Sequence, residues 1–199
     1  MNRLNKKAIA TALLAASLSF GAISNAQAES RALIMTIADY PVKPLQPVVY
    51  DAISAKRIAT AMGVPPQNVS TYADRQLTLA GMKSAMQSFA ASVAKGDNVL
   101  IYYSGHGSQD SKPGSAGECR EMLVPIDFTT NNYTGLYDDE LERYLVDLAS
   151  RASRVIVMND SCFSGGAATK AAAGGLTKSF NKNSDGYQCG NELNKSFTR

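Results

Sequence analysis

Residues 99–107 read VLIYYSGHG, and this stretch decides the fold class. It begins with an apolar run from Val99 to Tyr103, typical of a strand buried on both faces, and His106, the only histidine of the chain, follows the end of that run. A second stretch, VIVMNDSCFSGG at residues 155–166, places Cys162 after another apolar run. Open α/β sheets carry their chemistry at the carboxyl ends of parallel strands. The two stretches therefore predict a parallel sheet that presents Cys162 and His106 at one end.

Strand and helix patterns alternate along the chain around these two stretches. Strands are predicted at residues 31–38, 69–72, 99–103 and 154–160, and helices at residues 48–62, 79–95 and 138–148. Thr78 is the predicted N-cap of the second helix. The inward faces of the first two helices are predicted to contain Ile53, Ala55, Ile58 and Met62, and Met82, Met86, Phe89 and Val93. This alternation predicts an α/β fold in three layers, with a mainly parallel sheet flanked by helices.

The remaining segments are interpreted from their composition. Residues 108–120 are polar and are predicted to form a loop, whereas EMLVPID at residues 121–127 is predicted to be a short edge strand because Pro125 disfavours a central one. Residues 169–199 offer little to bury and are expected to form a flexible tail or linker. We therefore divide the chain into a leader at residues 1–28, one domain at residues 29–168 and the tail.

The leader has the features of a secretory signal peptide. Arg3, Lys6 and Lys7 precede a mostly apolar run at residues 8–23, and Ala26-Gln27-Ala28 offers small residues for cleavage. An uncleaved membrane anchor is the alternative, but the run is short and is interrupted by serine and glycine. We expect an exported protein, secreted or periplasmic, with no membrane segment after cleavage.

Charge and cysteine content limit the function classes. Without the leader the chain carries 17 basic and 17 acidic residues, so nothing suggests that it binds nucleic acid. The three cysteines, Cys119, Cys162 and Cys189, leave at least one thiol unpaired in an oxidising compartment. A bridge between Cys119 and Cys189 would leave Cys162 free, although the sequence does not define the pairing.

Cys162 and His106 are the residue types of a nucleophile and its base. A thiolate that attacks a peptide carbonyl also needs donors for the oxygen that becomes negative. The glycines around His106 allow a close backbone approach, so the N–H groups of Gly107 and Cys162 are the candidate donors. Either motif alone is explained as well by a structural turn or a buried cysteine, but the two together favour a catalytic site.

These motifs resemble the caspase-like cysteine peptidases, and within them the metacaspases and related bacterial proteins. The resemblance covers about residues 31–166, the large-subunit catalytic domain. It rests on the helix start at residues 50–52, YSGHG at 103–107, VPID at 124–127, DDEL at 138–141 and DSCFSG at 160–165. It implies a caspase-like fold and a cysteine endopeptidase with a dyad of Cys162 and His106.

The family's sheet has about six strands, the last two of which come from a small subunit after the cysteine. Only 37 residues follow Cys162, and none of them has a strand–helix–strand pattern. The resemblance therefore implies a sheet that lacks the small-subunit strands and has an open edge beyond the cysteine strand. Open edges are normally covered or paired, so a partner at this edge is expected.

The resemblance also implies a pocket for a basic side chain. Metacaspases place acids there to receive Arg or Lys, and the matching positions are Asp51 and Asp160, with Ser104 beside them. A buried carboxylate pair loses hydration, and a cationic substrate side chain offsets that loss. The expected substrate is a peptide or protein that is cut after Arg or Lys. On its own, Asp51 is explained equally well as the N-terminal cap of its helix.

Many metacaspases are activated by calcium through clustered acids. Asp138 and Asp139 match two of those positions, but Arg120 and Thr169 stand at two others and supply no carboxylate. Because calcium needs several oxygen ligands, we predict no metal site and no cofactor, and helix capping is the preferred role of Asp138.

Two other function classes stay open. One is a non-catalytic caspase-like interaction module that pairs through the open sheet edge. The other is a redox or thiol-binding protein that uses Cys162 with Cys119 or Cys189.

Overall fold

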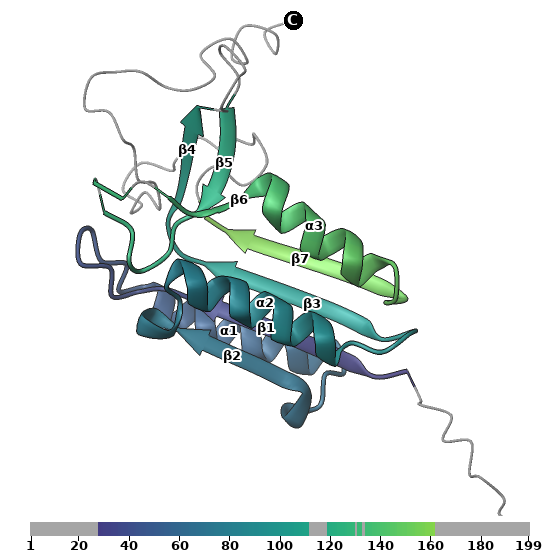
Figure 1. Cartoon of the computed structure of the whole chain (residues 1–199). Coiled ribbons are helices and arrows are strands. Elements are labelled where there is room, and N and C mark those ends of the chain that lie inside the picture. The colour runs from purple at the N-terminus through teal and green to yellow at the C-terminus, as the bar shows by residue number, and fades with distance from the viewer. Residues whose placement is uncertain (1–27, 112–118, 130, 133, 162–199) are drawn as a thin grey trace, which may run out of the picture.

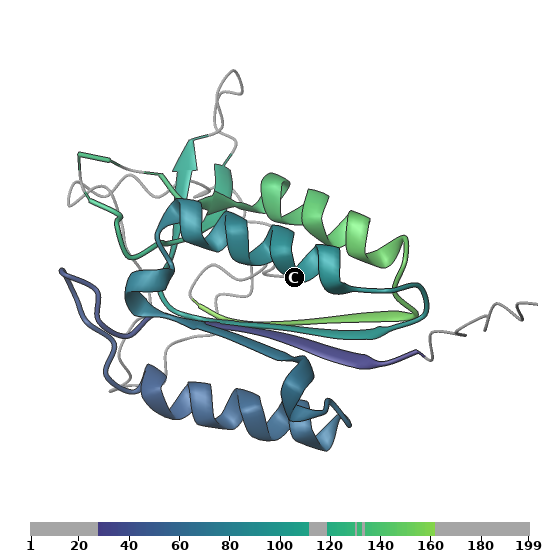
Figure 2. The same cartoon turned by 60° about the horizontal axis from the view of Figure 1, so that its bottom comes forward.

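Four parallel strands form the central sheet of the computed structural model, which describes residues 28–111, 119–129, 131–132 and 134–161. The strands are β1 (Ser30–Thr36), β2 (Val69–Ala73), β3 (Asn98–Ser104) and β7 (Arg154–Asp160), in the order β2-β1-β3-β7. Helix α1 (Val48–Ala61) covers one face, and α2 (Leu79–Ser92) and α3 (Asp138–Ala149) cover the other (Figure 1 and Figure 2). Single turns of 3₁₀ helix, η1 (Pro66–Asn68) and η2 (Asp74–Gln76), flank β2. The predicted three-layer α/β fold is confirmed.

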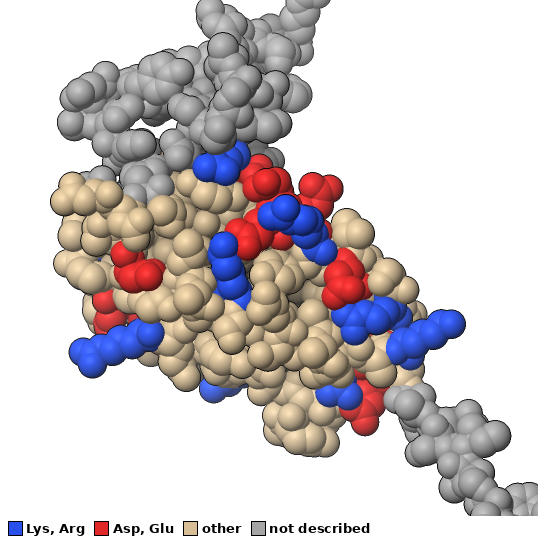
Figure 3. Space-filling model, in the orientation of Figure 1, with Lys and Arg blue, Asp and Glu red and all other residues tan. Residues whose placement is uncertain are grey.

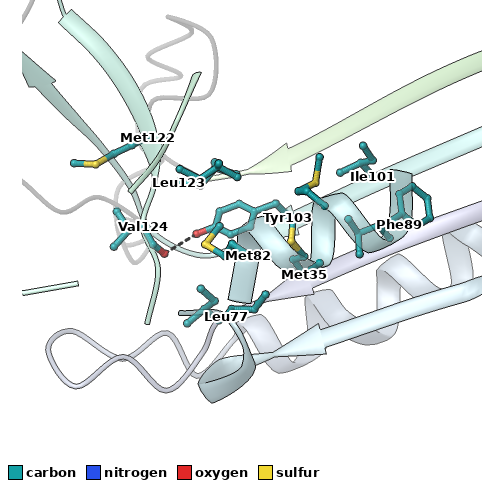
Figure 4. Packing of buried hydrophobic residues seen from close by; sticks show 14 of the residues in the cluster. Met35, Leu77, Met82, Phe89, Ile101, Tyr103, Met122, Leu123 and Val124 are labelled. Carbon is teal, nitrogen blue, oxygen red and sulfur yellow. Dashed lines mark hydrogen bonds between the residues drawn. The ribbon is translucent and has the colours of Figure 1, made fainter. Parts of the chain in front are cut away.

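Burial on both faces explains why the inner strands have continuous apolar sequences. In β3, Ile101 and Tyr103 lie in the large core cluster beneath α2 and α3, whereas Leu100 and Tyr102 pack on the α1 side. Figure 4 shows the large cluster, with Met35, Phe89 and Ile101 among its labelled side chains. The predicted bounds of all four strands agree with the structure within one or two residues.

Helix α2 begins as its sequence predicts. The Thr78 hydroxyl accepts a hydrogen bond from the Gly81 N–H at 3.0 Å, which satisfies a donor in the first helical turn. The four predicted inward residues of this segment are all buried. An N-cap of this kind contributes about 1 kcal/mol to stability.

Helix α1 is predicted correctly in extent but not fully in orientation. Ile53 was expected to face the core, yet 47% of it is exposed. The residues that face the sheet are Val48, Ala55 and Ala59, all completely buried, with Ile58 and Met62 only partly buried beside them. Small alanine side chains allow the helix to lie close against β1 and β3, and that close packing turns Ile53 to the outside.

A second, antiparallel sheet stands beside the first. It consists of β4 (Gly107–Ser111), β5 (Cys119–Leu123) and β6 (Leu136–Tyr137), in the order β4-β5-β6, and β4 and β5 rise away from the central sheet in Figure 1. The prediction of a loop over residues 108–120 is therefore wrong at both of its ends. The strand predicted at residues 121–127 is present only over residues 121–123, as part of β5. Its predicted edge position is wrong, because β5 lies between β4 and β6.

One buried carboxylate joins several segments at the amino end of the sheet. Asp97 is 1% exposed and accepts hydrogen bonds from the N–H groups of Glu29 at 2.8 Å and Ala94 at 2.9 Å, and from Nε of Arg31 at 2.8 Å. Burial alone would raise the pKa of Asp97, but these donors together lower it below the ordinary value of 3.8. The ionised carboxylate is therefore part of the folded structure.

Residues 1–27 of the leader and the whole tail lie outside the described residues, as do Cys162, Phe163, Thr169 and Cys189. Within the described ranges, the structure contains no helix that is both long enough and apolar enough to cross a bilayer. On the face drawn in Figure 3, the basic and acidic side chains lie interspersed.

Candidate active site

The carboxyl ends of β3 and β7 meet at one end of the central sheet. The parallel register pairs Ser104 with Asp160. His106 follows the first of these residues by two positions, and Cys162 follows the second by two positions. The carboxyl ends of both strands therefore lie at the same end of the sheet, and Cys162 itself is outside the described residues.

The His106 imidazole is completely buried and faces a backbone carbonyl. Its Nε2 lies 2.7 Å from the carbonyl oxygen of Lys43. A carbonyl oxygen can only accept a hydrogen bond, so Nε2 carries the hydrogen of the neutral ring, and Nδ1 carries the lone pair. The ring is thereby prepared to take a proton at Nδ1.

Lys43 supplies this carbonyl from an unusual backbone conformation. Its φ angle is 58°, in the left-handed region that few residues other than glycine adopt. The sequence predicted a loop at residues 39–47 from its three prolines but gave no reason to single out Lys43. Any residue has a main-chain oxygen, so this hydrogen bond to His106 does not require a particular residue type at position 43. The sequence therefore cannot reveal it.

Two buried tyrosines hold the backbone on either side of the imidazole. The His106 N–H donates to the Tyr40 hydroxyl at 3.0 Å, and that hydroxyl donates to the Val124 carbonyl at 2.8 Å. The Tyr103 hydroxyl lies 2.9 Å from the His106 carbonyl and 3.1 Å from the Val124 carbonyl, and Figure 4 shows the latter contact. The Tyr40 and His106 ring centroids are 4.5 Å apart. Burial raises the pKa of both phenols, so they remain neutral donors.

Gly105 is required by this packing. A Cβ atom at this position would lie 2.6 Å from the Tyr103 hydroxyl oxygen and 2.7 Å from the Tyr40 hydroxyl oxygen. The sequence suggested that the glycines beside His106 serve a tight turn and a close substrate approach. For Gly105, the structure adds a steric reason. Gly107 is the first residue of β4, and its role as an oxyanion donor stays a prediction.

The three predicted specificity residues lie together on the α1 side of the sheet. Asp51 accepts a hydrogen bond from the Ser104 hydroxyl at 2.8 Å, and Asp160 lies next to Ser104 in the strand register. The pKa of Tyr102 is raised to about 12, first by burial and then by the negative charges of Asp51 and Asp160, so both carboxylates act on one phenol. Asp51 lies inside α1, whose N-cap position is Pro47, so the alternative of an N-terminal cap is wrong.

A family model described as "Metacaspase, peptidase C14 domain" matches residues 30–170. The chain belongs to the metacaspase family. The chain is 31% identical over 94 residues to Metacaspase-1A of Aspergillus terreus, a segment that covers 46% of this chain and 23% of the relative. It is 31% identical over 90 residues to Metacaspase-1 of Saccharomyces cerevisiae, covering 44% and 20%. It is 29% identical over 121 residues to Metacaspase-4 of Arabidopsis thaliana, covering 56% and 27%.

The fold is also similar to that of protein GSU0716 from Geobacter sulfurreducens, with a TM-score of 0.49, 25% identity and coverage of 67% of this chain and 50% of that one. The matched segments span only about a quarter of the curated metacaspases. Membership in a family of cysteine peptidases agrees with the resemblance of the motifs. The roles of individual residues rest on the site itself.

The residues considered for calcium have other contacts in this metacaspase. Asp138 is the first residue of α3, and its Oδ1 accepts a hydrogen bond from the Asp139 N–H at 2.9 Å. The N-cap position of α3 is Tyr137, not Asp138. Asp138 instead accepts a hydrogen bond from a backbone N–H in the first turn of the helix. The Arg120 guanidinium lies 3.4 Å from the centre of the Tyr137 ring. Among the residues that the structure describes, no three His, Cys, Asp or Glu side chains gather as a metal site would require.

Proposed function

We propose that this metacaspase chain is an exported cysteine endopeptidase that cleaves peptide bonds after Arg or Lys. Cys162 is the nucleophile and His106 is its base. The observation that carries the proposal is the contact between His106 Nε2 and the Lys43 carbonyl, because it fixes the lone pair on Nδ1. A base whose tautomer is set by the backbone needs no third side chain to orient it.

The reaction follows from these roles. Nδ1 takes the proton of the Cys162 thiol, and the thiolate sulfur attacks the carbonyl carbon of the substrate. The N–H groups of Gly107 and Cys162 donate to the resulting oxyanion. The imidazolium then returns its proton to the leaving amine as the peptide bond breaks. Water, activated by the neutral imidazole, hydrolyses the thioester and regenerates the thiol.

Specificity for a basic residue is supported by the group formed by Asp51, Ser104 and Asp160. Two carboxylates lie close enough to one phenol to raise its pKa, and they stand at the same end of the sheet as His106. The Ser104 hydroxyl occupies one oxygen of Asp51 and orients the carboxylate. A guanidinium or ammonium group entering beside these acids forms charge-assisted hydrogen bonds, whereas an acidic side chain is repelled.

Cleavage of fluorogenic peptides tests the proposal. The full chain is expected to release the fluorophore from peptides that end in Arg or Lys and not from peptides that end in Asp. Cys162→Ala and His106→Ala are expected to abolish cleavage while circular dichroism shows an unchanged fold, and Cys189→Ala serves as a cysteine control. Equal turnover by the two active-site variants would rule out the dyad.

A second candidate function is a non-catalytic interaction module. The observation that favours it is β7, whose Val157 and Met158 are exposed at the end of the strand order. A thiol-reactive ketone attached to an Arg peptide separates the two functions. Rapid, saturable labelling of Cys162 supports a peptidase site, whereas labelling no faster than that of a simple alkylating reagent supports the module. N-terminal sequencing of the exported chain tests the leader and is expected to begin at Glu29.

A further inference from the structure

Asp74 links the carboxyl ends of two neighbouring strands. It directly follows β2, whose last residue, Ala73, is paired with Thr36 at the end of β1. Its Oδ1 accepts hydrogen bonds from the N–H groups of Ala38 at 2.7 Å and Asp39 at 2.9 Å. Hydrogen bonds to a carboxylate are stronger than those between neutral groups. The carboxylate therefore fixes the direction in which the chain leaves β1.

The backbone of Asp74 has a conformation that most residue types avoid. Its φ angle is 45°, in the left-handed region, which Asp and Asn adopt more readily than other residues with a side chain. Such conformations persist where the surroundings hold them, and they are common at functional sites. Here the carbonyl also accepts a hydrogen bond from the Leu77 N–H at 2.8 Å. Position 74 thus needs both a positive φ angle and a side-chain acceptor.

The segment held by this carboxylate leads to the imidazole. The Ala38 carbonyl accepts a hydrogen bond from the Leu45 N–H at 2.7 Å, so the chain between these two residues is a closed loop. Two residues of this loop contact His106. The Tyr40 hydroxyl accepts from the His106 N–H at 3.0 Å, and the Lys43 carbonyl lies 2.7 Å from Nε2. Both contacts therefore depend on the base of the loop staying in place.

We propose that Asp74 is a positioning residue for His106 and acts through the loop at residues 39–47. Its carboxylate holds the base of the loop, and the loop brings the Lys43 carbonyl to Nε2. Without the carboxylate, two N–H groups at the base lose their acceptor, and the loop gains conformations in which Nε2 loses its own. The consequence for catalysis rests on the proposed function, whereas the effect on the Nε2 hydrogen does not.

Two substitutions separate the carboxylate from the backbone conformation. Asp74→Gly removes the acceptor but adopts a positive φ angle without strain. Asp74→Asn keeps an acceptor oxygen and also tolerates this conformation. In Asp74→Gly, the Nε2 hydrogen of His106 is expected to exchange with water about tenfold faster than in wild type. In Asp74→Asn, exchange is expected to stay close to the wild-type rate. Spectra of a chain labelled with ¹⁵N-histidine measure this rate for the single histidine.

Asp97→Asn is the matched control. It changes a buried carboxylate acceptor at the amino end of the sheet and weakens the fold there. It is expected to leave exchange of the Nε2 hydrogen unchanged, and circular dichroism is expected to show that all three variants are folded. In peptide cleavage, Asp74→Gly is expected to lower kcat about tenfold with little change in KM, because Asp74 acts on the base and not on substrate. Asp74→Asn is expected to restore kcat.

The possible outcomes are distinct. Unchanged exchange in Asp74→Gly overturns the proposal, and so does equally fast exchange in Asp97→Asn, which would indicate a general loss of stability. An active chain in which Asp74→Gly speeds exchange but keeps the wild-type kcat also overturns it. A wild-type chain that cleaves no peptide contradicts the proposed function instead, while the exchange rates still support or overturn the link from Asp74 to His106.

Discussion

The Nε2 atom of His106 lies 2.7 Å from the carbonyl oxygen of Lys43, a residue in the left-handed backbone region. This single contact assigns the two ring nitrogens to different tasks. Nε2 donates to the Lys43 carbonyl, and Nδ1 is the atom that exchanges a proton in the mechanism that we propose. Because it uses the main chain, the arrangement depends on the loop at residues 39–47 keeping its conformation.

The tautomer can be observed directly, because His106 is the only histidine of the chain. In a chain labelled with ¹⁵N-histidine, the neutral ring is expected to show its hydrogen on Nε2, since the Lys43 carbonyl can only accept. Long-range proton–nitrogen correlation spectra measure this. A neutral ring with its hydrogen on Nδ1 would contradict the role that we give to the Lys43 carbonyl.

Substitution at Lys43 tests the loop itself. Lys43→Pro is expected to reduce kcat/KM sharply, because proline fixes φ at about −65° and cannot keep the carbonyl directed at the imidazole. Lys43→Gly is the matched control and is expected to keep activity, with stability changed by no more than about 1 kcal/mol, because glycine adopts positive φ without strain. Loss of activity in both variants would indicate that the lysine side chain matters instead.

Removing the Tyr40 hydroxyl tests the support of the histidine backbone. Tyr40→Phe keeps the ring beside His106 but leaves the His106 N–H and the Val124 carbonyl without this hydroxyl, at a cost of about 1–3 kcal/mol in the free energy of unfolding. We expect kcat to fall while KM changes little, because the hydroxyl does not touch substrate. Urea unfolding and steady-state kinetics measure the two effects, and Tyr50→Phe, at a residue 72% exposed, is the control.

The proposed recognition of a positive charge by Asp51 and Asp160 can be tested with a neutral analogue of arginine. The wild-type chain is expected to prefer a peptide ending in Arg over the same peptide ending in citrulline. Asp51→Asn and Asp160→Asn are expected to reduce this preference about tenfold or more, because each removes one carboxylate charge. The amide oxygen that Asp51→Asn introduces can still accept from the Ser104 hydroxyl, so the geometry is kept. An unchanged ratio of kcat/KM values would place the specificity elsewhere.

Asp97 gives a prediction for stability against pH. Its pKa is below 3.8 in the folded chain, so its ionised form stabilises the fold fully above pH 3.8, and this contribution is lost as pH falls through the folded pKa. Asp97→Asn is expected to lower the free energy of unfolding by about 1–3 kcal/mol at neutral pH, because both oxygens accept hydrogen bonds and an amide nitrogen cannot. The difference from wild type should shrink below pH 3.8. Asp39→Asn, at an exposed residue, is the control.

The sequence predicted the parts of the fold in which burial leaves a pattern. Strands β1 and β3 are covered on both faces, so their sequences are continuously apolar, and the cap of α2 is a side chain with a known preference. The β4–β5 pair was missed because its residues are polar and its stability comes from backbone pairing. The orientation of Ile53 was missed because helical spacing alone does not show that alanines face the sheet.

Some residues of the candidate site could also be found from the sequence, and others could not. His106 stood out because it is the only histidine and follows the end of a strand pattern. Asp51, Ser104 and Asp160 were singled out only by the resemblance to metacaspases. Tyr40 was recognisable only as a residue in a proline-rich loop, and its bond to the His106 N–H links segments 66 positions apart. Lys43 could not have been found, since any residue supplies a carbonyl. Sequence patterns thus offered candidates for the reacting groups and gave no sign of the backbone contacts around them.

The hydrogen bond from the Glu29 N–H to Asp97 has one more consequence. If the leader is removed after Ala28, as the sequence predicts, that amide becomes the free α-amino group of the new first residue. An α-amino group is largely protonated at neutral pH. The same contact would then become an ion pair with the buried aspartate, so the act of export would itself tighten the newly made end of the polypeptide onto its sheet.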